Sequence, residues 1–155
     1  MKRYTATLGL ILLGLLCVRG VAEEKLQPPP YDKSISDAEA LDIAEATFRY
    51  QFTNNASGAQ QNAKAYFLSV FEKDPSPEFL KRFGKHKPPV KKGSEFKIGK
   101  GLAFQVVTIK RVSKTKVEVS GGYYEAGLSS SGNTYFVEKK DGKWIVTSDK
   151  MHWIS

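Results

Sequence analysis

A tight-turn dipeptide between two alternating apolar segments constrains this sequence more than any other feature. Asp141-Gly142 separates residues 134–140 from residues 143–148, and an Asp-Gly pair in this setting is a strong signal for a two-residue β-hairpin. Residues 102–112 and 116–126, both rich in Val, Ile, Phe and Tyr, come before the hairpin. The sequence therefore predicts an antiparallel meander of consecutive strands at its C-terminal end, which residues 151–154 extend.

The segment before the meander carries helical signals. Ser36 and Glu39 have the spacing of a capping box, and apolar residues follow at helical intervals: Leu41, Ala44, Phe48 and Phe52. Pro77 suits the first turn of a short second helix, which Gly84 ends. Between the two, residues 63–71 are apolar nearly throughout, which favours a strand covered on both faces and leaves a helix as the alternative.

These elements predict an α+β fold, with an N-terminal helix and a short second helix packed on a curved antiparallel sheet. A chain of 155 residues has little room for a second core. We expect residues 1–22 to be a signal peptide, residues 23–35 a proline-rich linker and residues 36–155 one α+β domain.

The N-terminal 22 residues follow the pattern of a secretory signal. Two basic residues precede an apolar run at 8–18 that is short for a membrane span, and small residues lead up to Ala22. We therefore expect cleavage near Ala22, export to the periplasm or the medium, and no transmembrane span in the mature chain. A membrane-anchoring helix is the alternative. Cleavage also removes Cys17, the single cysteine, and with it any thiol or disulfide chemistry.

Most catalytic and cofactor signatures are absent from the sequence. Residues 127–132 have one residue too many for the Gly-x-Ser-x-Gly nucleophile elbow, and the glycines at 99 and 101 fit neither a dinucleotide fingerprint nor a P-loop. His86 and His152 are the only histidines and stand far apart, so we expect neither a metal site nor a cofactor. These absences favour a protein that is not an enzyme, although they leave cofactor-free catalysis open.

A basic segment runs from Lys81 to Lys100, with Glu95 as its single acidic residue, in a chain of formal net charge +8. Such density suits contact with anionic polymers. The phenylalanines nearby have the spacing of core residues rather than of an exposed base-stacking platform, so nucleic acid is not expected as a partner. A solvated loop is the simplest interpretation, and electrostatic contact with anionic envelope polymers is an alternative.

Polar residues on the meander are the candidate site. Alternation along residues 117–125 places Tyr123 and Glu125 on the apolar face, where a carboxylate would have a raised pKa and could act as general acid or base. A bulge at Gly121-Gly122 would instead leave Glu125 on the surface. His152 shares its parity with Trp144, so it faces the same pocket or packs beside the indole. The candidate ligand-binding set is Tyr123, Glu125, Tyr135, Trp144 and His152, with Glu125 and His152 as weak catalytic candidates.

The C-terminal part also resembles a known family. Between Gly132 and Trp144 the sequence reads Gly-x-Thr-Tyr-x-Val-x-Lys-x-Asp-Gly-Lys-Trp, within a run from 121 to 155 that resembles small exported bacterial domains of the NTF2-like, cystatin-related type. The resemblance covers residues 36–155 and implies a sheet curved into a cone around an internal cavity. Some members are cofactor-free isomerases or dehydratases, and many others only bind ligands. This chain has no counterpart of the enzymes' catalytic Asp or His pair.

The sequence as a whole predicts an exported, non-enzymatic module that binds a small-molecule or cell-envelope ligand through its sheet cavity or surface. The alternative is a cofactor-free lyase or isomerase with Glu125 as base, hydrogen-bonded to Tyr123, Tyr135 or His152. That alternative requires Glu125 to be buried and its pKa to be raised. A homodimer through the sheet surface is also left open, because cavity-lining and interface residues look alike in a sequence.

Overall fold

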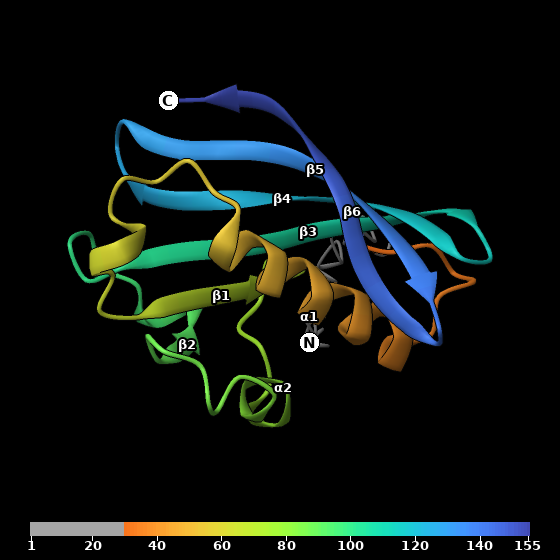
Figure 1. The fold of residues 1–155 in the computed structure, drawn as a ribbon. Coiled ribbons are helices and arrows are strands. Elements are labelled where there is room, and N and C mark those ends of the chain that lie inside the picture. The colour runs from red at the N-terminus through yellow and green to blue at the C-terminus, as the bar shows by residue number, and fades with distance from the viewer. Residues whose placement is uncertain (1–29) are drawn as a thin grey trace, which may run out of the picture.

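The structure, a computed structural model, describes residues 30–155, so the predicted signal peptide lies outside the described residues. Two short 3-10 turns, Gln60–Asn62 and Gly93–Glu95, accompany the main elements. In chain order these are α1 (Asp37–Thr53), β1 (Tyr66–Val70), α2 (Pro77–Lys81), β2 (Val90–Lys92), β3 (Leu102–Ser113), β4 (Lys116–Ala126), β5 (Ser129–Lys140) and β6 (Lys143–Ile154) (Figure 1). The fold is α+β, as predicted. Neither α1 nor α2 is long and apolar enough to cross a membrane.

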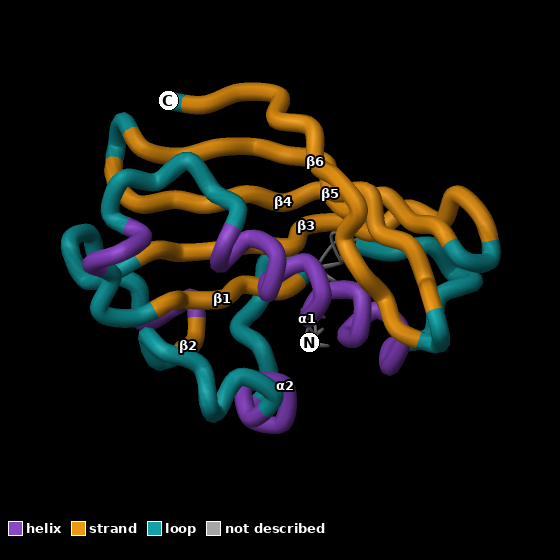
Figure 2. The backbone as a smooth tube through the Cα atoms, viewed as in Figure 1, coloured by secondary structure: helices purple, strands orange, loops and turns teal. Residues whose placement is uncertain are grey.

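One mostly antiparallel sheet contains all six strands, in the order β2-β1-β3-β4-β5-β6 (Figure 2). Strands β3 to β6 form the predicted antiparallel meander. Strand β1, however, runs parallel to both β2 and β3, so the prediction of an antiparallel sheet was wrong there. The connection through α2 is the physical reason, because a long crossover returns the chain to the same end of the sheet.

Helix α1 lies across one face of the sheet and contacts β3, β4, β5 and β6 (Figure 1). Ser36 caps its first turn, since the Ser36 hydroxyl accepts a hydrogen bond from the Glu39 backbone N–H at 3.2 Å. The Glu39 carboxylate does not complete the predicted capping box. It reaches β3 instead and forms an ion pair with Arg111 at 2.7 Å, which ties the start of the helix to the sheet.

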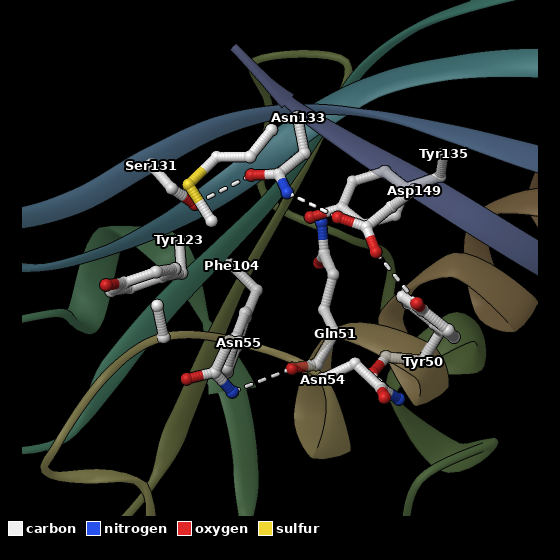
Figure 3. A pocket seen from close by; sticks show the side chains of 12 residues that line it. Tyr50, Gln51, Asn54, Asn55, Phe104, Tyr123, Ser131, Asn133, Tyr135 and Asp149 are labelled. Carbon is white, nitrogen blue, oxygen red and sulfur yellow. Dashed lines mark hydrogen bonds between the residues drawn. The ribbon is translucent and has the colours of Figure 1, made fainter. Parts of the chain in front are cut away.

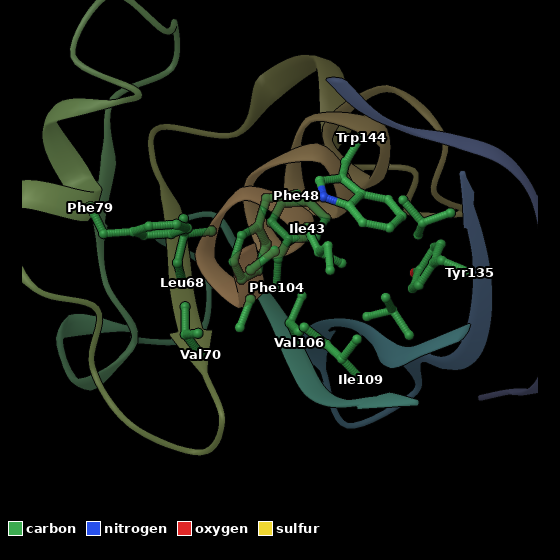
Figure 4. Packing of buried hydrophobic residues seen from close by; sticks show 14 of the residues in the cluster. Ile43, Phe48, Leu68, Val70, Phe79, Phe104, Val106, Ile109, Tyr135 and Trp144 are labelled. Carbon is green, nitrogen blue, oxygen red and sulfur yellow. The ribbon is translucent and has the colours of Figure 1, made fainter. Parts of the chain in front are cut away.

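The main core fills the space between α1 and the sheet, and α2 closes one end of it (Figure 4). Phe48 of α1 is fully buried and meets the rings of Phe79 and Phe83 edge-on, with ring centroids 6.2 and 6.4 Å away. Phe104 of β3 and Leu68 of β1 are buried from the sheet side. The two helices and the strands β1 and β3 therefore share one aromatic core.

The packed part of the chain begins before the predicted boundary at Ser36. Tyr31 forms a parallel bridge with Ile109 of β3, and its hydroxyl donates to Asp37 at 2.8 Å. Ile35 is buried. Residues 31–35, expected to be linker, thus belong to the domain, because an aromatic and an aliphatic side chain find partners on it.

Candidate functional site

A cavity of about 280 Å³ opens between the C-terminal end of α1 and the face of the meander (Figure 3). This volume lies just below the roughly 300–1,000 Å³ typical of small-molecule pockets, but a cavity of about 150 Å³ already admits benzene. Four aromatic side chains from the helix and three strands line it: Tyr50, Phe104, Tyr123 and Tyr135. The space suits a molecule of one ring with a short polar arm.

A chain of hydrogen bonds fixes the polar wall of the cavity. The Tyr50 hydroxyl donates to Asp149 Oδ1 at 2.8 Å, and Asn133 Nδ2 donates to Asp149 Oδ2 at 2.7 Å (Figure 3). Ser131 Oγ in turn donates to Asn133 Oδ1 at 2.8 Å. Helix α1 and strand β5 thus hold the Asp149 carboxylate of β6 in place through the neutral side chains of Tyr50 and Asn133. A carboxylate can accept about four hydrogen bonds, so this arrangement leaves it capacity for a ligand.

Gln51 contributes an unusual group to the cavity. The residue is 1% exposed, and its Nε2 donates to the backbone oxygen of Gln105 at 3.1 Å. Its Oε1 is buried and has no hydrogen-bond partner within residues 30–155. A buried unpaired acceptor costs about 1–3 kcal/mol, and such groups are rare in folded proteins. Because Gln51 is one of the residues that line the cavity, its unpaired acceptor is suited to a donor that arrives with a ligand.

Tyr135 stands opposite Gln51 and beside Tyr50, whose ring meets it edge-on at a centroid distance of 5.9 Å. Burial raises the pKa of the Tyr135 hydroxyl far above its ordinary value. The side-chain amide of Gln51 lowers this pKa in part, and the negative charge of Asp149 raises it further. The hydroxyl therefore stays protonated and can donate a hydrogen bond into the cavity throughout the neutral and alkaline range.

The raised pKa of Tyr135 predicts a loss of stability in alkali. The free energy of unfolding should fall as pH rises above about 10, because the unfolded chain releases the Tyr135 proton while the folded chain keeps it. Tyr135→Phe removes this contribution, so its free energy of unfolding, measured by urea denaturation between about pH 9 and 12, should fall less steeply than that of the wild type. Tyr124→Phe, on the partly exposed face of the sheet, is the matched control. Equal slopes for wild type and Tyr135→Phe would contradict the prediction.

The predicted ligand-binding residues do not all meet at this cavity. Tyr123 and Tyr135 line it. Trp144 is buried elsewhere, near the start of β6, where Arg111 and Lys139 lie 5.8 and 5.6 Å from its ring. The indole thus packs under cations and does not reach the cavity.

Glu125 lies outside the cavity, in a β-bulge. The pairing of β4 with β5 shifts between Tyr124 and Ala126, so Glu125 itself is the extra residue, whereas Gly121-Gly122 pairs in register. Its carboxylate accepts hydrogen bonds from Ser57 Oγ at 2.6 Å and Ser129 Oγ at 2.7 Å. These bonds lower the pKa of Glu125, whereas a catalytic base at this position required a raised one. The bulge turns the side chain toward the α1–β1 loop, where it holds that loop to the sheet.

His152 is exposed and also lies outside the cavity. Its Nε2 is 2.8 Å from the Thr134 hydroxyl on the neighbouring strand. The pairing of β5 with β6 shifts register between Phe136 and Val137 and again between Gly132 and Asn133. These shifts break the alternation between Trp144 and His152, and the shared parity therefore did not bring the two side chains together.

The basic segment forms a separate surface around α2 and β2. Arg82 pairs with Asp42 at 2.7 Å and Glu45 at 3.0 Å. Several lysines are exposed and make no ion pair within the described part of the chain: Lys81, Lys85, Lys87, Lys91, Lys97 and Lys100. The segment is not only loop, because β2 extends the sheet with a three-residue parallel strand. The sequence did not predict β2, because three residues of which two are lysines are too few to show an alternation of apolar and polar side chains.

No family model, curated protein or solved structure matches this chain. The candidate site therefore rests on its own geometry. In residues 30–155 no three His, Cys, Asp or Glu side chains converge as ligands of a metal ion.

The sequence interpretation missed Gln51, Tyr50 and Asp149, which together shape the cavity. One signal was available for Gln51, since it stands at helical spacing from Ile43, Ala44, Thr47 and Phe48, on the buried face of α1. Asp149 gave no such signal, because it follows a polar stretch of β6 whose register shifts reset the alternation.

Proposed function

We propose that this protein binds a small molecule in the cavity between α1 and the meander. The observation that carries the proposal is the buried Oε1 of Gln51, a residue that lines the cavity, because this oxygen has no hydrogen-bond partner within residues 30–155. A donor on a bound ligand would satisfy this oxygen and offset the cost of leaving it unpaired. The aromatic walls supply apolar contact, and the polar wall around Asp149 supplies orientation, which is the composition typical of ligand pockets.

The proposed role is binding and not catalysis. The lyase or isomerase alternative depended on a base at Glu125, and that carboxylate is held by two serines outside the cavity with a lowered pKa. We further propose that the fold is of the NTF2-like type, which the packing of α1 against the four-stranded meander supports. From the sequence pattern alone, we also propose that the protein is exported and that its ligand comes from the cell envelope.

Blocking the mouth of the cavity tests the proposal. Ala56 lines the cavity from an exposed loop position, so a phenylalanine there would occupy the opening without disturbing the core. We expect fragments of one ring with a polar arm to give saturation-transfer NMR signals with the wild-type protein. Ala56→Phe should weaken their binding at least tenfold, about 1.4 kcal/mol.

Gly58→Phe provides the control, because a Cβ at Gly58 meets no atom within 4 Å and the residue does not line the cavity. This variant should bind fragments as the wild type does. A diverse fragment library that yields no binder, or binders that Ala56→Phe leaves unaffected, would refute a ligand site in this cavity.

A further inference from the structure

The cavity has the opposite charge to the rest of the molecule. The chain carries a formal net charge of +8, yet no lysine, arginine or histidine among residues 30–155 lines the cavity. Asp149 is the one carboxylate that lines it within the same residues. A pocket of this kind repels anions and attracts cations over short range.

The Asp149 carboxylate has no cationic partner within residues 30–155. Every ion pair in that part of the chain involves other acids: Glu39, Asp42, Glu45 and Glu138. Asp149 is held instead by the neutral donors Tyr50 and Asn133. Its charge is therefore positioned but not neutralised, and lone pairs on its oxygens remain free.

The other cavity groups favour the same kind of ligand. Gln51 Oε1 has no hydrogen-bond partner within residues 30–155 and can only accept, so the group that pairs with it must be a donor. The rings of Tyr50, Tyr123 and Phe104 present π-faces or edges to the space, and aromatic faces attract ammonium groups. A carboxylate, a carbonyl oxygen and aromatic walls together recognise a protonated amine attached to an apolar body.

We infer, on the basis of the proposed function, that the ligand is a small organic ammonium compound of about one ring. Its N–H groups bind Asp149 and Gln51 Oε1, and its apolar part packs between Phe104 and Tyr123. A bare metal ion fits less well, because Asp149 belongs to no group of three His, Cys, Asp or Glu side chains in residues 30–155. A carboxylate or phosphate ligand would meet an unneutralised negative charge.

Three probes of matched size test the inference: benzylamine, benzyl alcohol and benzoate, titrated at pH 7 and followed by NMR. Benzylamine, which is protonated at this pH, should bind at least tenfold more tightly than benzyl alcohol, and benzoate should not bind measurably. Asp149→Asn should weaken benzylamine binding ten- to a hundredfold, the range expected for a charge-assisted hydrogen bond. Benzyl alcohol carries no charge to pair with the carboxylate, so its affinity should fall less than that of benzylamine.

Asp141→Asn is the matched control, because it makes the same charge change in the exposed β5–β6 turn and should leave all affinities unchanged. Equal binding of the amine and the alcohol, no binding of any probe, or a preference that survives in Asp149→Asn would overturn the ammonium inference. The proposed function fails separately. It is refuted if Ala56→Phe leaves the binding of every fragment unaltered, whatever the charge of that fragment.

Discussion

Phe48→Ala should destabilise the protein by about 3–5 kcal/mol, the range for truncating a fully buried phenylalanine. Phe48 is 0% exposed and packs on the rings of Phe79 and Phe83, within the core between α1 and the sheet (Figure 4). Truncation leaves a cavity in that core. Because a folded domain is stable by only about 5–15 kcal/mol, the variant should lose a large share of its free energy of unfolding. Urea denaturation curves measure the change.

Phe96→Ala is the control for this prediction. Phe96 is half-buried and meets the rings of Phe67 and Tyr124 edge-on on the other face of the sheet, at centroid distances of 5.5 and 5.7 Å. We expect a cost of about 1–2 kcal/mol there, since less apolar surface is lost from a partly solvated site. If Phe96→Ala cost as much as Phe48→Ala, the core would not be centred between α1 and the sheet.

Gly121→Ala should destabilise the protein by about 1–3 kcal/mol through overpacking. A Cβ at Gly121 would collide with the backbone oxygen of Gln105 and come within 3.1 Å of Gln51 Nε2. The same oxygen accepts the hydrogen bond that holds the Gln51 amide. The substitution therefore strains the β3–β4 pairing and displaces Gln51 at the same time, so stability and ligand binding should both decrease.

Gly127→Ala separates this effect from a general cost of replacing glycine. A Cβ at Gly127 meets no atom within 4 Å, so the free energy of unfolding should change by no more than about 0.5 kcal/mol. Thermal unfolding of the two variants side by side makes the comparison. A Gly121→Ala protein as stable as Gly127→Ala would show that the sheet does not approach α1 as closely as described.

Much of the fold follows from local signals in the sequence. The Ser36 cap, the Pro77 helix start and the Asp141-Gly142 turn each act over a few residues, and the structure confirms the elements that they predict. Strand β5, by contrast, begins at Ser129, earlier than predicted. Residues 129–133 are small and polar, and they pair because their neighbours on β4 and β6 hold them, which no local pattern reveals.

The candidate site was less predictable than the fold, because β-bulges decide which side chains face the cavity. Alternation placed Tyr123 on the buried face, as the structure has it, since the pairing of β4 with β5 shifts only after Tyr124. It failed at Glu125 and His152, which lie at or beyond register shifts. A single extra residue reverses the face of every side chain that follows it, and neither Glu125 nor the residues around 149 carry a sequence mark of such a shift.

The most direct test of the account is a map of backbone amide shifts in a ¹⁵N-labelled sample titrated with benzylamine. If the cavity is the binding site, the shifting resonances will cluster at residues 50–56, 131–135 and 149–151 and at Phe104 and Tyr123, which together line it. Resonances of the basic segment, residues 81–100, should stay in place. Shifts that spread over the surface, or that cluster in the basic segment, would contradict a ligand site between α1 and the meander.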